Sequence, residues 1–277
     1  VQITGGAYSN TMRFVYSYRN CDVYTLGGNA DGFAPKLGAG KGNVFYGCYS
    51  WENSDDGWDS YDKDSLTYNL TYTNCACWNN GDPTIFTGEY DYNNGNALDT
   101  DLLLVELISK KDSSFASNYK NGKFSLPGGS FIRTTQGTLS IANWKSKYDG
   151  NPNGFKFGSV NTTSSCVRTV TNCLAFGHSS KGFDNNNSSC TAYLSNCISY
   201  DNGYNYYMPP FTLKKFSNVL SFSGASSNKL PSGYTASIPS SSKQAQIRST
   251  VNATVSSITT QCKNNVIPGE VYFNIFS

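Results

Sequence analysis

Short runs of alternating apolar and polar residues recur along the chain, and turn-forming residues follow each of them. Apolar or aromatic side chains occupy every second position of a run, which is the period of a half-buried β-strand. The runs that we predict to be strands are 12–16, 44–46, 66–68, 166–170 and 192–194. Asn, Ser, Thr, Gly and Tyr are abundant and long-chain helix formers are scarce, so the pattern indicates a β-protein with many turns.

A dipeptide that ends in cysteine recurs beside these runs. Its occurrences are Asn20-Cys21, Gly47-Cys48, Asn74-Cys75, Asn172-Cys173 and Asn196-Cys197, and Asn218-Val219 continues the series. Apart from one gap of 98 residues, the spacing is 22 to 27 residues. A repeat of this period is typical of a solenoid, and the leucine pattern of leucine-rich repeats is missing. The sequence therefore predicts a parallel β-helix, with the asparagines stacked as a ladder and the cysteines pointing into the core.

A glycine followed by an aromatic residue forms a second landmark between the cysteine landmarks. The aromatic members are Phe33, Trp58, Phe155, Phe183 and Tyr204. Cys75 and Phe155 are 80 residues apart, whereas three other such intervals are 12, 10 and 10 residues, so about 70 residues are inserted within one coil. We expect a single β-helix domain over 1–277, with an inserted lobe at about 79–150 and a C-terminal capping or tail region at about 223–277.

Two of these regions carry predictions of their own. The insert contains an apolar stretch at 101–111 that fits a short helix or a strand, and the lobe is either one wall of a cleft or purely structural. A capping helix is expected at 243–262, because solenoids need covered ends. The chain begins abruptly at Val1 on an incomplete coil, so we expect that coils upstream of it are missing and that the protein is processed or trimmed.

Composition narrows the class of partner. A net charge of +2 gives no indication of nucleic-acid binding. No apolar run is long enough to cross a bilayer, so neither a membrane nor a nucleic acid is expected as partner, and we expect a monomer. Most of the nine cysteines are predicted to be reduced core residues, and the pairs Cys166/Cys190 and Cys173/Cys197 are the best candidates if any disulfide forms.

Aligning the coils on the glycine-aromatic pair gathers charged residues. Asp31 and Asp56 then occupy equivalent positions on adjacent coils, and Asp55 and Asp59 belong to the same turn as Asp56. Such a cluster is repulsive without a counter-cation, and oxygen ligands of this kind suit Ca²⁺. The alternative is that each aspartate only caps a turn.

Lysines and one histidine complete the list of candidates. Lys156 falls one coil after Asp59, where a bound cation lowers the pKa of an amine and makes it usable as a base; the alternative is a salt bridge with Asp59. Lys36, Lys181 and His178 are candidate substrate contacts, although isolated lysines are usually just exposed and His178, the single histidine, also fits an ordinary surface or turn residue.

These motifs resemble those of polysaccharide lyase family 9, the pectate lyases with a right-handed parallel β-helix. The matching segments are Ala30-Asp31-Gly32-Phe33-Ala34-Pro35-Lys36-Leu37, Gly42-Asn43-Val44-Phe45-Tyr46-Gly47-Cys48, Trp51-Glu52-Asn53-Ser54-Asp55-Asp56-Gly57-Trp58-Asp59, Asn153-Gly154-Phe155-Lys156 and Lys181-Gly182-Phe183-Asp184-Asn185-Asn186. The resemblance covers roughly 20–207 without the insert. Two departures concern substrate subsites: Tyr49 stands where the family often has arginine, and the insert before Lys156 is unusually long.

The resemblance implies that Asp31, Asp55, Asp56 and Asp59 bind a catalytic Ca²⁺ and that Lys156 is the base of a β-elimination. The hypothesis is then a secreted, extracellular, calcium-dependent pectate lyase that acts on pectin or polygalacturonate, an anionic polysaccharide of plant cell walls, and leaves 4,5-unsaturated products. A lyase for rhamnogalacturonan or another uronic-acid polymer is the nearest alternative, and a non-catalytic carbohydrate-binding β-helix is another. A β-helical glycosidase is less suited, because it needs paired acid and base carboxylates.

Overall fold

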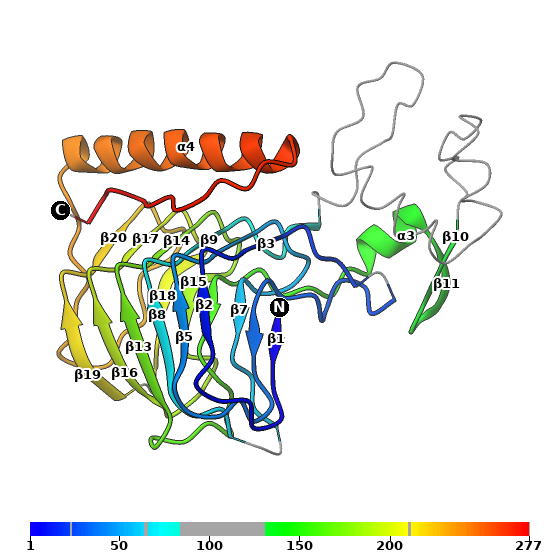
Figure 1. Ribbon diagram of the computed structural model, residues 1–277, viewed down its shortest axis with the longest axis horizontal. Helices are drawn as coiled ribbons and strands as arrows, with labels where there is room; N and C mark the ends of the chain where they lie inside the picture. Colours follow the sequence, from blue (N-terminus) through cyan, green and yellow to red (C-terminus); the bar gives the residue numbers. More distant parts are fainter. Residues whose placement is uncertain (23, 64–65, 84–130, 210–211, 277) are drawn as a thin grey trace.

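The chain winds into coils whose short strands stack into three parallel sheets (Figure 1). The structure is a computed structural model that describes residues 1–22, 24–63, 66–83, 131–209 and 212–276. The first sheet consists of β2 (Thr11–Arg13), β5 (Asn43–Tyr46), β8 (Leu70–Thr73), β13 (Val167–Thr171), β16 (Thr191–Ser195) and β19 (Thr212–Ser217). The second sheet consists of β3 (Tyr16–Tyr18), β6 (Tyr49–Trp51), β9 (Ala76–Trp78), β14 (Leu174–Phe176), β17 (Ile198–Tyr200) and β20 (Leu220–Phe222).

The third sheet is the one that carries the candidate site. Its strands are β7 (Trp58–Asp59), β12 (Phe155–Lys156), β15 (Lys181–Asp184) and β18 (Tyr204–Tyr207). Beyond β7, Phe33 pairs with Trp58, and the adjoining β4 (Ala34–Pro35) pairs with β1 (Gln2–Ile3). Every pairing within the three sheets is parallel, so each coil places equivalent residues one strand spacing from those of the next coil. This architecture is the predicted parallel β-helix.

A sharp corner joins the first sheet to the second in every coil. Its residue has a positive φ, between 50° and 64°, a conformation that asparagine and glycine tolerate best. The corner residues are Phe14, Gly47, Asn74, Asn172, Asn196 and Asn218. Side-chain amides link the last four in a ladder, with 3.0, 3.1 and 2.9 Å between donor and acceptor. The recurring asparagine thus follows from the backbone, and the predicted ladder is confirmed from Asn74 onward.

The first coil departs from the predicted register. Tyr16 pairs with Tyr49, which places Val15, not Cys21, in the column of core cysteines. Asn20 instead stacks on Asn53 of the next coil, to which its side-chain amide donates a 2.7 Å hydrogen bond. The assignment of Asn20-Cys21 to the corner of the first coil was therefore wrong. The corner residue of this coil is Phe14, so neither asparagine nor glycine marks it in the sequence.

Other strand predictions also shift. The run 12–16 is split by the corner into β2 and β3, and the strand expected at 66–68 is found at Leu70–Thr73. At the fifth glycine-aromatic pair, Tyr206 and not Tyr204 aligns with Phe183. The runs near 44–46, 166–170 and 192–194 match β5, β13 and β16 within two residues.

Rings and thiols fill the inside of the solenoid. Phe33, Trp58, Phe155, Phe183 and Tyr206 form a continuous buried stack, with neighbouring ring centroids 4.6 to 5.0 Å apart. All nine cysteines lie in described residues and are free thiols, and seven of them are buried. This confirms the prediction that most of the cysteines are reduced core residues, and neither Cys166/Cys190 nor Cys173/Cys197 is bridged.

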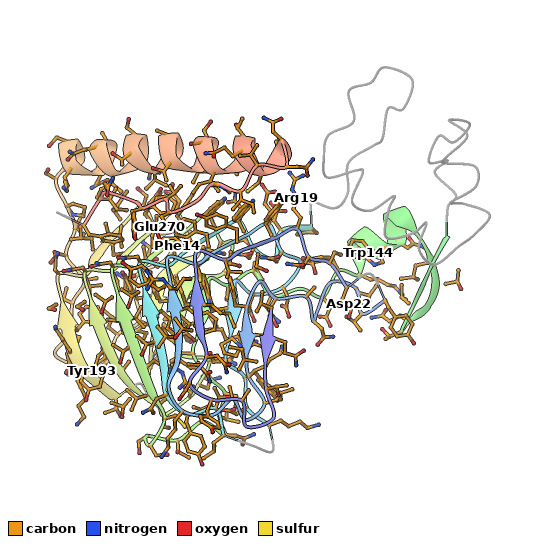
Figure 2. The ribbon with its side chains drawn as sticks, in the orientation of Figure 1. Phe14, Arg19, Asp22, Trp144, Tyr193 and Glu270 are labelled. Carbon is orange, nitrogen blue, oxygen red and sulfur yellow. The ribbon has the colours of Figure 1, made fainter. Side chains whose placement is uncertain are left out.

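The long insertion adds no coil to the solenoid. Trp58 pairs with Phe155, so β7 and β12 are neighbours although 97 residues separate them. Within the insert the structure describes a hairpin of β10 (Phe131–Thr134) and β11 (Gly137–Ser140), followed by α3 (Ile141–Ser146). Trp144 of α3, labelled in Figure 2, is fully buried. It packs edge-on against Tyr148. The predicted helix or strand at 101–111 lies outside the described residues.

The C-terminal helix covers a side of the solenoid. Helix α4 (Ser241–Lys263) runs along the second sheet, and residues 264–276 return between the helix and that sheet (Figure 1). Ile247, Val251 and Ile258 of α4 share one buried cluster with rings of the second sheet. The sequence therefore located the helix, but its packing is lateral and not across an end of the coils. No helix in the described part of the chain has the length and apolar character needed to traverse a membrane.

Candidate active site on the third sheet

Two columns of side chains, which we call the charged columns, run across the outer surface of the third sheet. The first column consists of Asp31, Asp56, Asn153, Lys181 and Tyr204. The second consists of Ala34, Asp59, Lys156, Asp184 and Tyr207. The second-column residue directly follows a ring of the buried stack and faces the other way, because neighbouring side chains of a strand point to opposite faces. The first-column residue stands two positions before the ring, on the other side of the glycine. For Asp31, Asp56, Asp59 and Lys156 the register of the coils is the one that the glycine-aromatic alignment predicts, whereas Tyr204 aligns with Lys181 and not with Phe183.

The glycine of each repeat is required by close packing between coils. A Cβ at Gly57 would lie 2.7 Å from the carbonyl oxygen of Gly154, and one at Gly154 would lie 2.5 Å from that of Gly182. Such contacts exclude any side chain larger than hydrogen. The glycines thereby bring adjacent coils close enough for the charged columns to interact.

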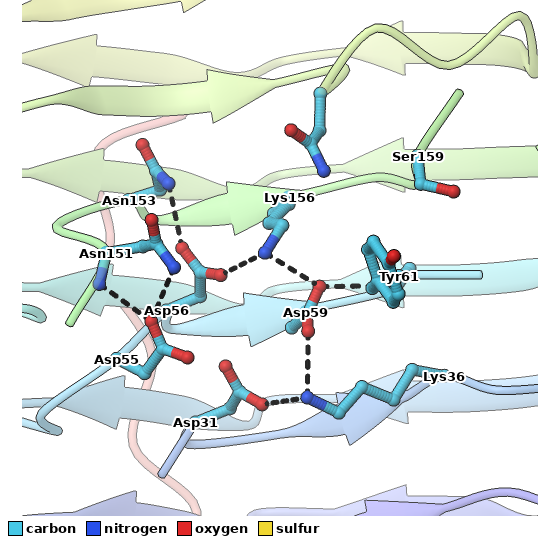
Figure 3. Close-up of polar contacts among 12 residues, drawn as sticks. Asp31, Lys36, Asp55, Asp56, Asp59, Tyr61, Asn151, Asn153, Lys156 and Ser159 are labelled. Atoms are coloured by element: carbon cyan, nitrogen blue, oxygen red, sulfur yellow. Dashed lines mark hydrogen bonds and ion pairs between the residues drawn. The ribbon is translucent and has the colours of Figure 1, made fainter. Parts of the chain in front are cut away.

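Carboxylates and lysines form one connected cluster (Figure 3). Lys36 Nζ lies 2.7 Å from Asp31 Oδ2 and 2.8 Å from Asp59 Oδ2. Lys156 Nζ lies 2.8 Å from Asp56 Oδ2 and 3.3 Å from Asp59 Oδ1. Asp59 is thus shared by both lysines. The salt bridge between Lys156 and Asp59, the alternative that the sequence left open, is present in this arrangement.

Asp55 is held by the end of the insert. Its Oδ1 accepts hydrogen bonds from the backbone N–H of Asn151 at 2.7 Å and from the Asn151 amide at 3.0 Å. Asn153 similarly donates to Asp56 Oδ1 at 2.8 Å. These two asparagines position the carboxylates from the segment that returns from the insertion.

The donor set fits a hard divalent cation. Asp31, Asp56 and Asp59 each offer a carboxylate oxygen, and these oxygens lie within 4.8 Å of one another. Asp55 is outside this group of three but lies beside it (Figure 3). Asp31 Oδ1 is buried and has no hydrogen-bond partner, although a buried carboxylate oxygen normally has one. Among the described residues, Asp31, Asp56 and Asp59 form ion pairs with two lysines, so an oxygen-seeking ion such as Ca²⁺ is compatible with the residues present.

Burial dominates the electrostatics of the carboxylates. It raises the pKa of Asp31 to about 7, to which the charge of Asp59 adds. Burial also raises the pKa of Asp55 and that of Asp56. These shifts mean that burial disfavours the charged form of the carboxylates.

The pKa values of the two lysines are raised, whereas a lysine that acts as a base needs a lowered pKa. Burial lowers the pKa of Lys156, but the carboxylates of Asp56 and Asp59 outweigh it and the net pKa is raised. The pKa of Lys36 is likewise raised, because Asp59 and Asp31 outweigh the effect of burial. Both amines are therefore protonated in this arrangement.

His178 is not placed where it can contact a substrate. It is 1% exposed and stands inside the solenoid, in a ladder of buried amides between Asn80 and Asn202. Burial lowers its pKa to about 4, so the ring is neutral. The proposed substrate contact at His178 was wrong, and so was the alternative of a surface residue, because this histidine replaces an asparagine of the core ladder.

Sequence reasoning assigned no role to three residues at the site. Tyr61 donates its backbone N–H to Asp59 Oδ1 at 3.0 Å, and its ring lies 5.8 Å from Lys156 Nζ. Asn151 and Asn153 hold the carboxylates as described. The signal for the two asparagines was their place directly before the Gly154-Phe155-Lys156 motif, whereas nothing in the sequence distinguishes Tyr61 from the other tyrosines.

Comparison with known proteins places this geometry in a family. Residues 1–98 match the model of the Pel9A-like right-handed β-helix region. "Pectate lyase L" of Dickeya dadantii is 31% identical over 206 residues, which are 74% of this chain and 34% of that protein. "Pectate lyase PEL9" of Emericella nidulans is 29% identical over 192 residues, which are 63% of this chain and 43% of that protein.

Solved structures agree with the sequence comparison. The crystal structure of pectate lyase Pel9A superposes with a TM-score of 0.54 at 27% identity, over 87% of this chain and 47% of that one. This chain therefore spans less than half the length of the relatives that it matches. The family-model match, the relatives and the solved neighbour agree that this chain is similar to Pel9A-like right-handed β-helix proteins and to pectate lyases.

Proposed function

We propose that this protein is a secreted, calcium-dependent pectate lyase that cleaves polygalacturonate by β-elimination. The observation that carries the proposal is the juxtaposition of Lys156 with the buried carboxylates of Asp56 and Asp59 on neighbouring coils. The proposal is supported by the similarity of this chain to proteins named pectate lyases. Pectin is a polyanion, and the two lysines and the unpaired carboxylate oxygen suit a site that receives both an anion and a cation.

Asp31, Asp55, Asp56 and Asp59 would hold the Ca²⁺. Bound there, Ca²⁺ would supply positive charge that attracts the carboxylate of a galacturonate residue and makes the proton on C5 more acidic. Asn151 and Asn153 fix the orientation of Asp55 and Asp56, so the carboxylates are arranged before the ligand arrives.

Lys156 is the residue that would remove the C5 proton. Its pKa is raised in the structure by Asp56 and Asp59, and that cause is removed when these carboxylates are neutralised by another cation. The neutral Nζ then accepts the proton from C5. The electron pair of the broken C–H bond forms the C4–C5 double bond, and the glycosidic oxygen on C4 departs with its electrons and takes up a proton from solvent.

The test is the ultraviolet absorbance of the unsaturated product. Polygalacturonate is incubated with the protein in Ca²⁺ or in excess chelator, and rhamnogalacturonan is run in parallel. We expect absorbance to rise on polygalacturonate only with Ca²⁺. A product from rhamnogalacturonan alone would reassign the substrate, and binding without product on any uronate polymer would favour the non-catalytic alternative.

A further inference from the structure

The charged columns change character beyond Lys156. Toward β4 and β7 they are acidic, whereas the next strand, β15, presents Lys181, and β18 after it presents Tyr204 and Tyr207. Tyr207 in turn pairs with Lys229 of the following coil. The outer surface therefore runs from a carboxylate cluster, past Lys156, to a strip of lysines and tyrosines.

Lys181 is held in place but remains accessible. Its Nζ lies 2.8 Å from Asp184 Oδ2 and 4.7 Å from the centre of the Tyr207 ring. The Lys181 side chain is 25% exposed, which leaves ammonium hydrogens for a further acceptor. Asp184 is fixed by the backbone N–H of Asn186, which donates at 2.8 Å, so this ion pair is anchored to the strand.

An ammonium beside a tyrosine ring suits an acidic sugar. The ammonium binds a carboxylate by a charge-assisted hydrogen bond, and the aromatic ring packs against the apolar face of a pyranose. Lys181 lies one strand beyond Lys156, which is about 4.8 Å along the axis of the solenoid. A polymer that lies along the charged columns therefore meets Lys181 directly after Lys156.

We propose that Lys181 and Tyr207 form a subsite for the carboxylate of the uronate next to the cleaved bond. This proposal rests on the proposed lyase function and specifies its substrate. The subsite rewards polymers with a carboxylate on successive sugars, as in polygalacturonate. A polymer in which uronates alternate with neutral sugars gains nothing from Lys181.

The test measures binding of oligogalacturonate without turnover. Lys156→Ala is the background, Ca²⁺ is present throughout, and the affinity for an oligogalacturonate is measured by calorimetry. The variant Lys181→Gln removes the charge, and Lys181→Arg retains it. Lys41→Gln is the matched control, since Lys41 also lies over a tyrosine ring, that of Tyr68 at 5.4 Å, but away from the third sheet. A carboxyl-reduced oligosaccharide serves as the uncharged ligand.

We expect Lys181→Gln to weaken binding of the oligogalacturonate about tenfold, the size of one charge-assisted hydrogen bond. Lys181→Arg and Lys41→Gln should remain within about threefold of the background, and the carboxyl-reduced ligand should not distinguish the variants. Equal affinity of Lys181→Gln and the background for oligogalacturonate overturns the subsite, and so does an equal loss with the uncharged ligand.

Failure of the subsite is distinguishable from failure of the proposed function. If the parent protein cleaves polygalacturonate and Lys181→Gln binds normally, only the subsite is wrong. If the parent neither cleaves nor binds it, both proposals fall. Thermal unfolding of each variant is recorded. Should Lys181→Gln not fold, Tyr207→Leu provides a separate comparison: weaker binding of both ligands is expected because the ring contact is lost, and unchanged binding of both overturns the subsite.

Discussion

Two stacks of side chains, built on the same coils, differ in what they repeat. On the second sheet the outer position carries a ring in every coil, and we call this stack the aromatic column. It consists of Tyr18, Trp51, Trp78, Phe176, Tyr200 and Phe222, with neighbouring centroids 4.5 to 5.8 Å apart. In the charged columns the residue type changes from coil to coil instead. The repeated aromatic residues give helix α4 a continuous apolar surface to pack against. The varied residues of the charged columns bring carboxylates and lysines together at one place.

The largest expected effect is a loss of activity on substitution of a residue in the charged columns. Lys156→Ala removes the proposed base, and we expect the rate of product formation to fall by about 10³-fold or more, because a general base contributes on that scale. The rate is measured by absorbance with saturating Ca²⁺. In saturating Ca²⁺ the melting temperature should stay near that of the parent, because the bound cation compensates the carboxylates of Asp56 and Asp59 that Lys156 contacts. Retained activity would remove Lys156 from the mechanism.

A substitution in the aromatic column should lower stability and leave the candidate site intact. Trp78 is 2% exposed and stacks between Trp51 and Phe176. Trp78→Ala should lower the free energy of unfolding by about 4 kcal/mol, as for other buried tryptophans. Denaturant unfolding measures it, and Ca²⁺ affinity of the folded variant should be unchanged. A large loss of Ca²⁺ affinity at temperatures where the variant is folded would contradict the separation of the two stacks.

The third prediction concerns His178, which takes the place of an asparagine in the buried ladder between Asn80 and Asn202. The pKa of His178 is about 4 in the folded protein, against 6.5 when the chain is unfolded, so the unfolded state binds a proton first as pH falls. Stability from this group is fully present above pH 6.5 and is lost as pH falls toward 4, by on the order of 3 kcal/mol. His178→Asn restores the residue of the neighbouring rungs, Asn80 and Asn202, and should flatten this part of the pH profile.

The smallest effect concerns the corner ladder. Asn196 has φ 52° and exchanges amide hydrogen bonds with Asn172 and Asn218. Asn196→Ala should cost about 2 kcal/mol of unfolding free energy, from the left-handed backbone and the lost bonds. Asn196→Gly, which copies Gly47, keeps the backbone preference and should cost about half as much. If glycine is as costly as alanine, the hydrogen bonds and not the backbone account for the asparagine.

The fold and the arrangement of the charged columns could be predicted because both depend on local rules. Glycine is required where Gly57 and Gly154 approach the next coil, and a positive φ requires asparagine or glycine at the corner. Those two constraints mark the sequence once per coil and so reveal the register. They fail where a coil satisfies them differently: Phe14 takes the corner of the first coil, and Asn205 stands where Gly182 does in the coil before.

Contacts between distant segments could not be predicted. The side-chain ladder accepts a histidine because imidazole, like an amide, can both donate and accept, and a lone histidine carries no mark of this. The place of Lys36 between Asp31 and Asp59 depends on side-chain length and burial, not on spacing. The lateral position of α4 depends on the rings of the second sheet, which only the assembled coils bring together.

The junction between β7 and β12 has a consequence for the order of folding. Most neighbouring coils close after fewer than about thirty residues, as from Phe155 to Phe183, but Trp58 and Phe155 are 97 residues apart. The added loop-closure entropy is only about 1 kcal/mol, so the junction is tolerated thermodynamically. Non-local pairing is nevertheless slow to form. Asp59 and Lys156 meet across this junction, so during refolding the proposed lyase activity should appear after most of the β-structure has formed.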